Sequence, residues 1–458
     1  MPERETKIIK TDRLGWTERI CYGCGSIGVR LVPGVTIGFL LVYLTNVAML
    51  DIAACSAIIG VSKFFDGISD IAVGSIIDRT ESGLGKARVW LLRMALPLAV
   101  SAMLLYWVPP QLPQLLKYVY VFLIYNIVNT VIVTFNQISV FSMVSLMADD
   151  SKEHDLLGSI QTIARSLGSL ISSVLFVKLL NFFTDEPGNQ NTQAAYSRSM
   201  AVICVAVVVM TLIMVSGTRE RVRTGLTGSR KKKNYFRETA ASVRTLLKNR
   251  YWVILIVCDL LLNLIFHFMA TGATYYSLYV LHDMNYVSLI LLTNLIPSIV
   301  MMFVIPVMIN RYGKRKLFVA GLIIAIAGLT GFGMAAPSIK PMMAFNVLYG
   351  AGNGLVKALS FMLIADLVTY TERKTGQFSP GTGNAGISAT EKLGAGLGNM
   401  IFGLALSAAG FNAALDAQPA SVGTMVSALF IWIPALLFII ILVIFIFLFD
   451  LERIVNEN

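Results

Sequence analysis

Long apolar stretches alternate with short polar ones along nearly the whole chain. Each stretch is close to the roughly 20 residues that an α-helix needs to cross the hydrocarbon core of a bilayer. The pattern predicts about twelve membrane-spanning helices, several with an interior Gly or Pro of the kind that transporter helices tolerate. The predicted spans are residues 21–49, 52–77, 89–108, 116–147, 158–183, 197–216, 251–281, 286–310, 317–336, 342–370, 385–410 and 422–449.

Composition agrees with a chain whose solvent is lipid. Of the 458 residues, 56% are hydrophobic and 14% are charged, against roughly 25% charged in a soluble protein. The net charge of +11 would suggest nucleic acid as a partner of a soluble chain, but here most of the excess lies in loops on one side of the membrane. We therefore expect no nucleic-acid partner. Residues 21–50 are too long and too rich in Gly for a cleavable signal peptide.

The distribution of Lys and Arg predicts the topology. Segment 217–250 is densely basic and is expected to be a cytoplasmic linker between six spans on either side. Most of the other basic residues fall on the same side, with only Lys117, Arg198 and Lys340 outside. We predict an N-terminal bundle at 1–216 and a C-terminal bundle at 251–458, with both termini cytoplasmic in a bacterial inner membrane.

The two halves resemble each other weakly. Similar segments follow equivalent spans of each half, as expected for a duplicated transporter of two pseudo-symmetric six-helix bundles. The matching segments are Asp78-Arg79 with Asn310-Arg311, Asp149 with Asp366, and Arg165-Ser-Leu-Gly168 with Lys392-Leu-Gly394. The charges of the first two pairs are candidates for a cytoplasmic gate, with solvated helix ends as the alternative.

Charges within the predicted spans point to function, because each costs at least about 2.5 kcal/mol at mid-bilayer. Asp66 and Asp70 lie one turn apart on one helix face, where they can bind a proton or a hard cation such as Na⁺. Lys63 lies on the same stripe, and a structural ion pair with Asp66 is the alternative. Lys392 is too deep to reach water easily, so its expected partner is Asp66 or Asp70. Arg165 fits either a cavity role or an anchor at the cytoplasmic end.

No enzyme or metal-cofactor constellation accompanies these charges. Cys21 and Cys24 form a CxxC without a second Cys or His pair, and we interpret them as small apolar residues. The chain has no Walker or Gly-rich nucleotide motif, which disfavours ATP-driven transport. We therefore expect a transporter that has no cofactor beyond its coupling cation.

Several segments resemble signatures of the glycoside-pentoside-hexuronide:cation symporters of the major facilitator superfamily. They are Tyr22–Gly28 (YGxG), Phe65–Asp70 (WDAxxDP), Asp78–Lys86 (DRTxSRWGRxR), Ala365–Gly376 (ADxxDYxExKTG) and Lys392-Leu-Gly394 (the lysine of the eleventh helix). The resemblance covers nearly the whole chain. It implies an all-α membrane protein of twelve helices in which Asp66 and Asp70 bind the coupling cation, Na⁺ or H⁺.

The departures from the family pattern concern the substrate. By the resemblance, two sugar-binding acids fall on Arg30 and Val140, the cation-site Thr falls on Gln137, and an aromatic residue falls on Lys357. Arg pairs with carboxylate, sulfonate or phosphate through two parallel hydrogen bonds. With Lys357 and Lys392 nearby, an anionic substrate such as a hexuronide or glucuronide is one hypothesis. The other is a neutral sugar, with Arg30 paired to Asp66 or Asp70.

The resemblance implies cation-coupled sugar symport by a monomer in contact with lipid, with alternating access between the two halves. Two other functions remain open: symport of an amphiphile such as a lysophospholipid, and a membrane sensor that does not transport. No appended domain supports the sensor.

Overall fold

The computed structural model describes residues 14–148, 151–184, 192–221, 250–375, 380–415 and 417–448. Regular structure in these ranges is entirely helical. In the first half the helices are α1 (Trp16–Val42) with η1 (Tyr43–Val47), α2 (Ile52–Arg79), α3 (Lys86–Leu105), α4 (Gln114–Tyr125) with η2 (Asn126–Val133) and α5 (Thr134–Met147), α6 (Ser151–Phe182), and α7 (Gln193–Gly217). In the second half they are α9 (Arg250–Tyr279), α10 (Asn285–Tyr312), α11 (Lys314–Ala335), α12 (Ile339–Thr375), α13 (Pro380–Ala408), and α14 (Ala420–Ser427) with η3 (Ala428–Trp432) and α15 (Ile433–Leu448).

The helices are long and apolar enough to form a membrane bundle. In the described residues ten helices are long and apolar enough to span a membrane, and α2 is an eleventh if its two parts are counted as one span. The remaining long helix, α13, carries Glu391 and Lys392 and is less apolar. Large apolar side chains face outward, such as Leu96 and Phe303, which are 68% and 62% exposed. This distribution suits a hydrocarbon solvent and confirms the predicted fold class.

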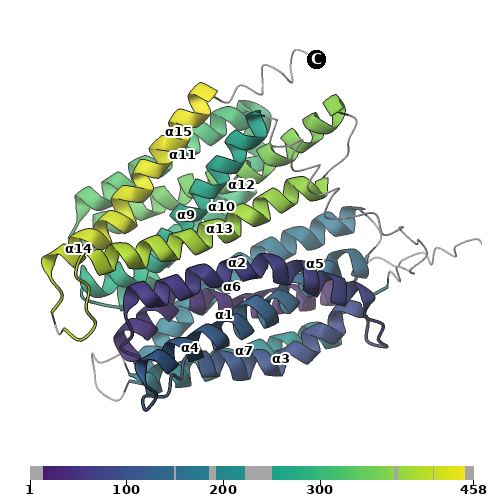
Figure 1. Ribbon diagram of the computed structural model, residues 1–458. Helices are drawn as coiled ribbons and strands as arrows, with labels where there is room; N and C mark the ends of the chain where they lie inside the picture. The colour runs from purple at the N-terminus through teal and green to yellow at the C-terminus, as the bar shows by residue number, and fades with distance from the viewer. Residues whose placement is uncertain are drawn as a thin grey trace, which may run out of the picture.

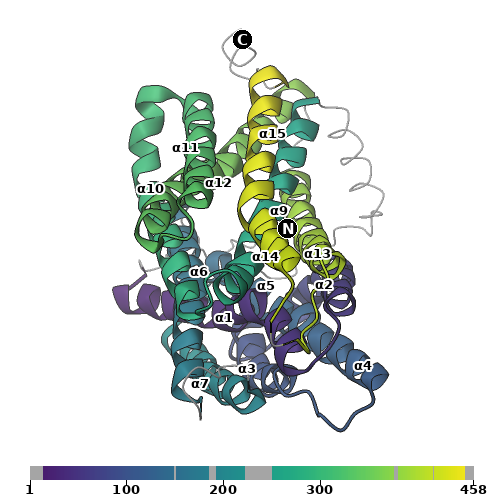
Figure 2. The ribbon, with the colours of Figure 1, turned by 90° about the vertical axis from the view of Figure 1, so that its left-hand side faces the viewer.

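The helices form two groups that follow chain order. Figure 1 shows α1–α7 on one side and α9–α15 on the other, and Figure 2 shows the same separation from a second direction. Contacts between the groups run chiefly from α2 to α13, from α6 to α10 and from α1 to α9. The boundaries predicted at 217 and 250 remain a prediction, since residues 222–249 lie outside the described ranges.

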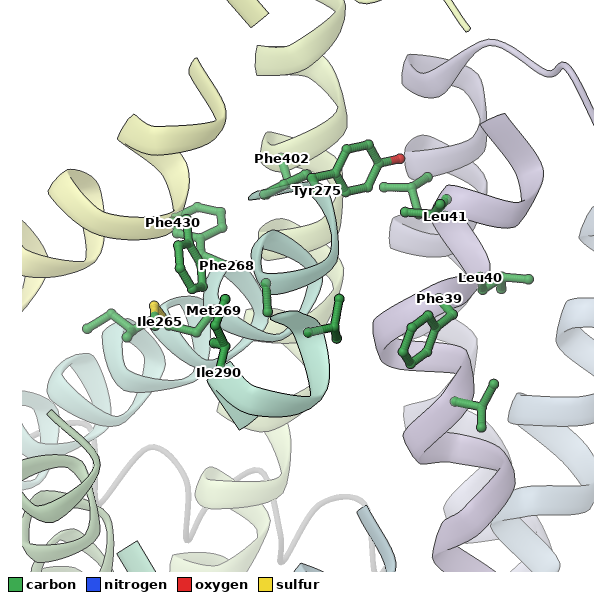
Figure 3. Packing of buried hydrophobic residues seen from close by; sticks show 14 of the residues in the cluster. Phe39, Leu40, Leu41, Ile265, Phe268, Met269, Tyr275, Ile290, Phe402 and Phe430 are labelled. Atoms are coloured by element: carbon green, nitrogen blue, oxygen red, sulfur yellow. The ribbon is translucent and has the colours of Figure 1, made fainter. Parts of the chain in front are cut away.

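The groups meet through an apolar core with a few polar bonds at one end. Phe39, Leu40 and Leu41 of α1 lie opposite residues of α9 and α13, among them Tyr275 and Phe402 (Figure 3). Thr274 donates a hydrogen bond to the Gly38 carbonyl at 2.8 Å, and Asn181 donates one to Asn285 at 2.6 Å. These bonds lie near the far ends of α1 and α6, away from the end where α7 leads into the linker.

Glycines set the same register in both halves. A Cβ on Gly168 of α6 would lie 2.8 Å from the Ile27 carbonyl oxygen and 2.9 Å from the Arg30 Cβ on α1. A Cβ on Gly394 of α13 would lie 2.5 Å from the Asn263 Cβ on α9. The pairs α1–α6 and α9–α13 therefore pack closely at equivalent positions, and Arg30 corresponds to Asn263.

A second contact supports this register. One turn further along, Gly34 of α1 packs on Ser172 of α6, and His267 of α9 packs on Gly398 of α13. Counting back three residues from Gly168 and Gly394 then matches Arg165 with Glu391. The repeat in the sequence had matched Arg165 with Lys392, and helix packing moves that match by one residue.

Candidate functional site

Two carboxylates and one lysine of α2 form a charge network with one lysine of α13. The Lys63 ammonium lies 2.8 Å from Asp66 Oδ2, within the same helix. Lys392 of α13 forms an ion pair with Asp70 and donates a hydrogen bond to the Asp66 backbone carbonyl at 2.9 Å. The expected partnership of Lys392 with this carboxylate pair is therefore confirmed. Because Lys392 comes from the other half, this network also joins the two halves.

The fourth span supplies neutral oxygens to Asp66. Thr130 donates to Asp66 Oδ1 at 2.6 Å and to the Asn126 side-chain oxygen at 3.1 Å, and Asn126 donates to Ser62 of α2 at 2.9 Å. Both Asn126 and Thr130 belong to the π-helical turn η2, a distortion that is frequent at functional sites. Neither residue was predicted from the sequence. The four-residue spacing of two polar residues in an apolar span is the signal that was available.

Helix α2 bends where its carboxylates lie. Its parts Ile52–Gly67 and Ala72–Arg79 differ in direction by 44°. Gly67 lies beside Asp66 and has open space where a Cβ would be. Asp66 belongs to the first part and Asp70 lies between the two parts, and each carboxylate has a different lysine as its partner.

A basic pocket lies among α1, α5 and α6 of the first half. The Arg30 Nε donates to the Ser169 hydroxyl at 3.1 Å, and the Arg165 guanidinium lies 5.0 Å from the centre of the Phe141 ring. In the described residues neither arginine forms an ion pair, so Arg30 is not paired with Asp66 or Asp70. The pocket is lined by Ser26, Val29, Arg30, Gln137, Val140, Phe141, Gln161 and Arg165.

Gln137 and Val140 belong to this pocket rather than to the carboxylate network. Gln137 lies seven residues beyond Thr130, the residue that contacts Asp66, and lines the pocket together with Arg30. Val140 is 2% exposed, and its carbonyl accepts a hydrogen bond from the Tyr22 hydroxyl at 3.0 Å. The structure thus places Gln137 and Val140 with the arginines.

The second half contributes charges of both signs. The Lys357 ammonium lies 4.8 Å from the centre of the Phe266 ring. Lys357 of α12, Asp259 of α9 and Glu391 of α13 are the charged residues of the second half near this level of the bundle, and Asp259 is 5% exposed.

The remaining candidates lie at helix ends. Asp78 and Arg79 at the end of α2 are exposed, and Lys86 donates to the Asp78 backbone carbonyl at 3.1 Å. Arg311 at the end of α10 is exposed, with its guanidinium 5.3 Å from the centre of the Tyr312 ring. Asp149 lies outside the described residues, as does the side chain of Asp366, so the predicted pairing of gate charges stays a prediction.

The two helical groups together have the fold of the major facilitator superfamily. The solved structure of the nucleoside transporter NupG superposes with a TM-score of 0.64 at 14% identity, covering 93% of this chain and 99% of that one. At this identity the likeness shows the fold alone.

The sequence matches the family described as MFS/sugar transport protein over residues 21–453, and the chain belongs to that family. It is 27% identical to the isoprimeverose transporter of Lactiplantibacillus pentosus, covering 93% of this chain and 87% of that protein. It is 25% identical to the glucuronide carrier protein homolog of Escherichia coli K12 (88% and 85% covered) and to the putative glycoside/cation symporter YagG of the same strain (93% and 90%). The resemblance to the glycoside-pentoside-hexuronide symporters is thereby confirmed. These relatives are transporters by name, and the chain is an integral membrane protein.

Proposed function

We propose that this protein couples the movement of Na⁺ or H⁺ to the uptake of a sugar or glycoside that carries an anionic group. The observation that carries the proposal is the bridge from Lys392 of one half to Asp70 and to the Asp66 carbonyl of the other. This ion pair can break and re-form, and it joins two halves that must move relative to each other during alternating access.

The coupling cation binds among the oxygens of Asp66, Asp70, Thr130 and Asn126. Carboxylate, hydroxyl and amide oxygens are ligands of hard cations, and a carboxylate also accepts a proton. In the arrangement described above, each carboxylate is neutralised by a lysine. When a cation binds, its positive charge replaces part of the charge that the lysines supply to the carboxylates. Lys392 is then released from Asp70, and the link between the halves weakens.

The substrate binds between the halves, with its anionic group at Arg30 and Arg165. Two guanidinium groups share the basic pocket of the first half with the amides of Gln137 and Gln161, which suit sugar hydroxyls. Lys357 adds positive charge from the second half. One of the relatives, by its name, carries glucuronides, whose carboxylate fits this charge.

Alternating access follows from the placement of the contacts. The bundles 1–216 and 251–458 rock about the central region, with both termini and the linker in the cytoplasm. The basic linker supports that orientation. Breaking the Lys392 bridge and the bonds at the far ends of α1 and α6 opens the side opposite the linker.

The test is the thermal stability of the purified protein with methyl glucoside, methyl glucuronide or a sulfonated sugar, each with and without Na⁺. A ligand at 100 times its Kd stabilises the folded state by about 2.7 kcal/mol. We expect a shift with the acidic sugars that grows with the cation, and loss of the cation effect in Asp70→Asn. Asp78→Asn, at an exposed helix end, is the matched control. An increase in thermal stability with the neutral glucoside alone would contradict a substrate-binding role for Arg30.

A further inference from the structure

The second half carries a carboxylate that the proposed function does not yet use. Asp259 of α9 is 5% exposed and is held on one side only. Both of its hydrogen bonds reach Oδ2, one from the Thr390 hydroxyl of α13 and one from the Asn263 amide at 3.2 Å. In the described residues Oδ1 has no hydrogen-bond partner.

Symmetry places Asp259 at the edge of the substrate region. The glycine contacts match Arg30 with Asn263, and therefore Ser26 with Asp259, four residues before each. Ser26 lines the basic pocket of the first half. Its counterpart in the second half is thus a buried carboxylate.

A second polar group on the same helix face also lacks a partner. His267 lies eight residues after Asp259 and is 6% exposed, and its Nδ1 is buried without a hydrogen-bond partner in the described part of the chain. His267 packs against Gly398 of α13, so it lies at the same contact between α9 and α13 as Asp259. Buried polar atoms in native proteins are generally paired, and an unpaired one calls for a partner such as a water molecule, an ion or a ligand.

We propose that Asp259 is a substrate-binding residue that accepts hydrogen bonds from the sugar hydroxyls through Oδ1. Thr390 and Asn263 are positioning residues that hold Oδ2 and so aim Oδ1 at the ligand. This inference rests on the proposed function, because it requires a sugar in the region between the halves.

This arrangement fixes the orientation of the bound sugar relative to the two halves. The first half offers cations to the anionic end of the sugar, and the second half offers an acceptor to its hydroxyls. A charged acceptor is suited to hydroxyl donors, since hydrogen bonds to charged groups are about twice as strong as neutral ones.

The experiment compares three ligands that separate charge from hydroxyls. Methyl glucuronide has both, methyl glucoside has hydroxyls alone, and cyclohexanecarboxylate has charge alone. Asp259→Ala should weaken the binding of both sugars by about 10- to 100-fold and leave that of cyclohexanecarboxylate unchanged. Arg30→Gln should show the complementary pattern, with weaker binding of the two carboxylates and unchanged binding of methyl glucoside.

Controls separate a local effect from misfolding. Cys258→Ala changes the adjacent buried residue and should bind all three ligands as the wild type does. Stabilisation by the coupling cation should persist in Asp259→Ala, since its ligands lie on α2 and η2. If Asp259→Ala does not fold, Asp259→Asn keeps an acceptor for Thr390 and should show a smaller loss with the same ligand pattern.

The outcomes distinguish the two proposals. If the wild type binds methyl glucoside but not methyl glucuronide, the anionic substrate is excluded, while the effect of Asp259→Ala on methyl glucoside still decides the role of this residue. Wild-type affinity of Asp259→Ala for both sugars would overturn the inference, as would an equal loss for all three ligands. If the wild type binds neither sugar, both proposals fail.

Discussion

Helix pairs α1–α6 and α9–α13 pack in the same register but carry different charges. Gly168 and Gly394 bring the helices together at equivalent positions. Around them, Arg30 and Arg165 stand where the other half has Asn263 and Glu391, and Ser26 stands where it has Asp259. The comparison teaches that both halves achieve close backbone approach through glycine, while the side chains around these contacts differ in charge.

The largest expected effect comes from reversing one of these charges. Arg165→Glu replaces a cation of the basic pocket with an anion. We expect the affinity for methyl glucuronide to fall by at least about 100-fold, because a charge-assisted bond is lost and a repulsion is added. The measurement is ligand-dependent thermal stability, with Glu391→Gln as the comparison in the other half. If Arg165→Glu bound the glucuronide normally, the anion would have to lie elsewhere.

Adding a methyl group to the shared register should harm both halves equally. Gly168→Ala and Gly394→Ala force a Cβ into the neighbouring helix, and we expect each to lower stability by about 1–3 kcal/mol. Gly74→Ala is the control, because nothing lies within 4 Å of its added Cβ. Melting temperatures in one detergent provide the measurement. A loss in only one half would show that the two contacts are not equivalent.

The two lysines of the carboxylate network should behave differently, because only one joins the halves. Lys392→Met removes the link from α13 to Asp70, whereas Lys63→Met removes a pair within α2. Spin labels at Leu115 and Leu415, both exposed, report the distance between the halves at the end opposite the linker. We expect a broader, longer distance distribution in Lys392→Met than in Lys63→Met. Identical distributions would remove the bridge from the mechanism.

The smallest expected effect concerns the hydroxyl of Thr130. Thr130→Val keeps the side-chain shape and removes the donor to Asp66, so the affinity for the coupling cation should fall by about 3- to 15-fold, the equivalent of one ordinary hydrogen bond. Thr134→Val, one turn along and bonded only to the Asn129 carbonyl, is the matched control. Cation titration of thermal stability measures both. An equal response of the two variants would exclude Thr130 as a ligand.

The membrane fold was predictable from the sequence by itself. Hydrophobic length predicts the spans, because every backbone group in lipid must be bonded within a helix. The carboxylate pair on α2 was also predictable, since a four-residue spacing places Asp66 and Asp70 on one face. So was the partnership of Lys392 with them, because a charge deep in a span needs an opposite charge.

Only the tertiary structure decided which half supplies each part of the site. Thr130 reaches Asp66 because η2 winds as a π-helix beside the bend in α2, and no local pattern fixes that register. Arg30 lies against Ser169 and shares a pocket with Arg165 because Gly168 lets α1 and α6 approach closely. The partnership of Asp259 with Thr390 could not be predicted from spacing, since the two residues are 131 positions apart along the chain. Contacts between helices depend on packing across the bundle, and spacing along one helix does not specify them.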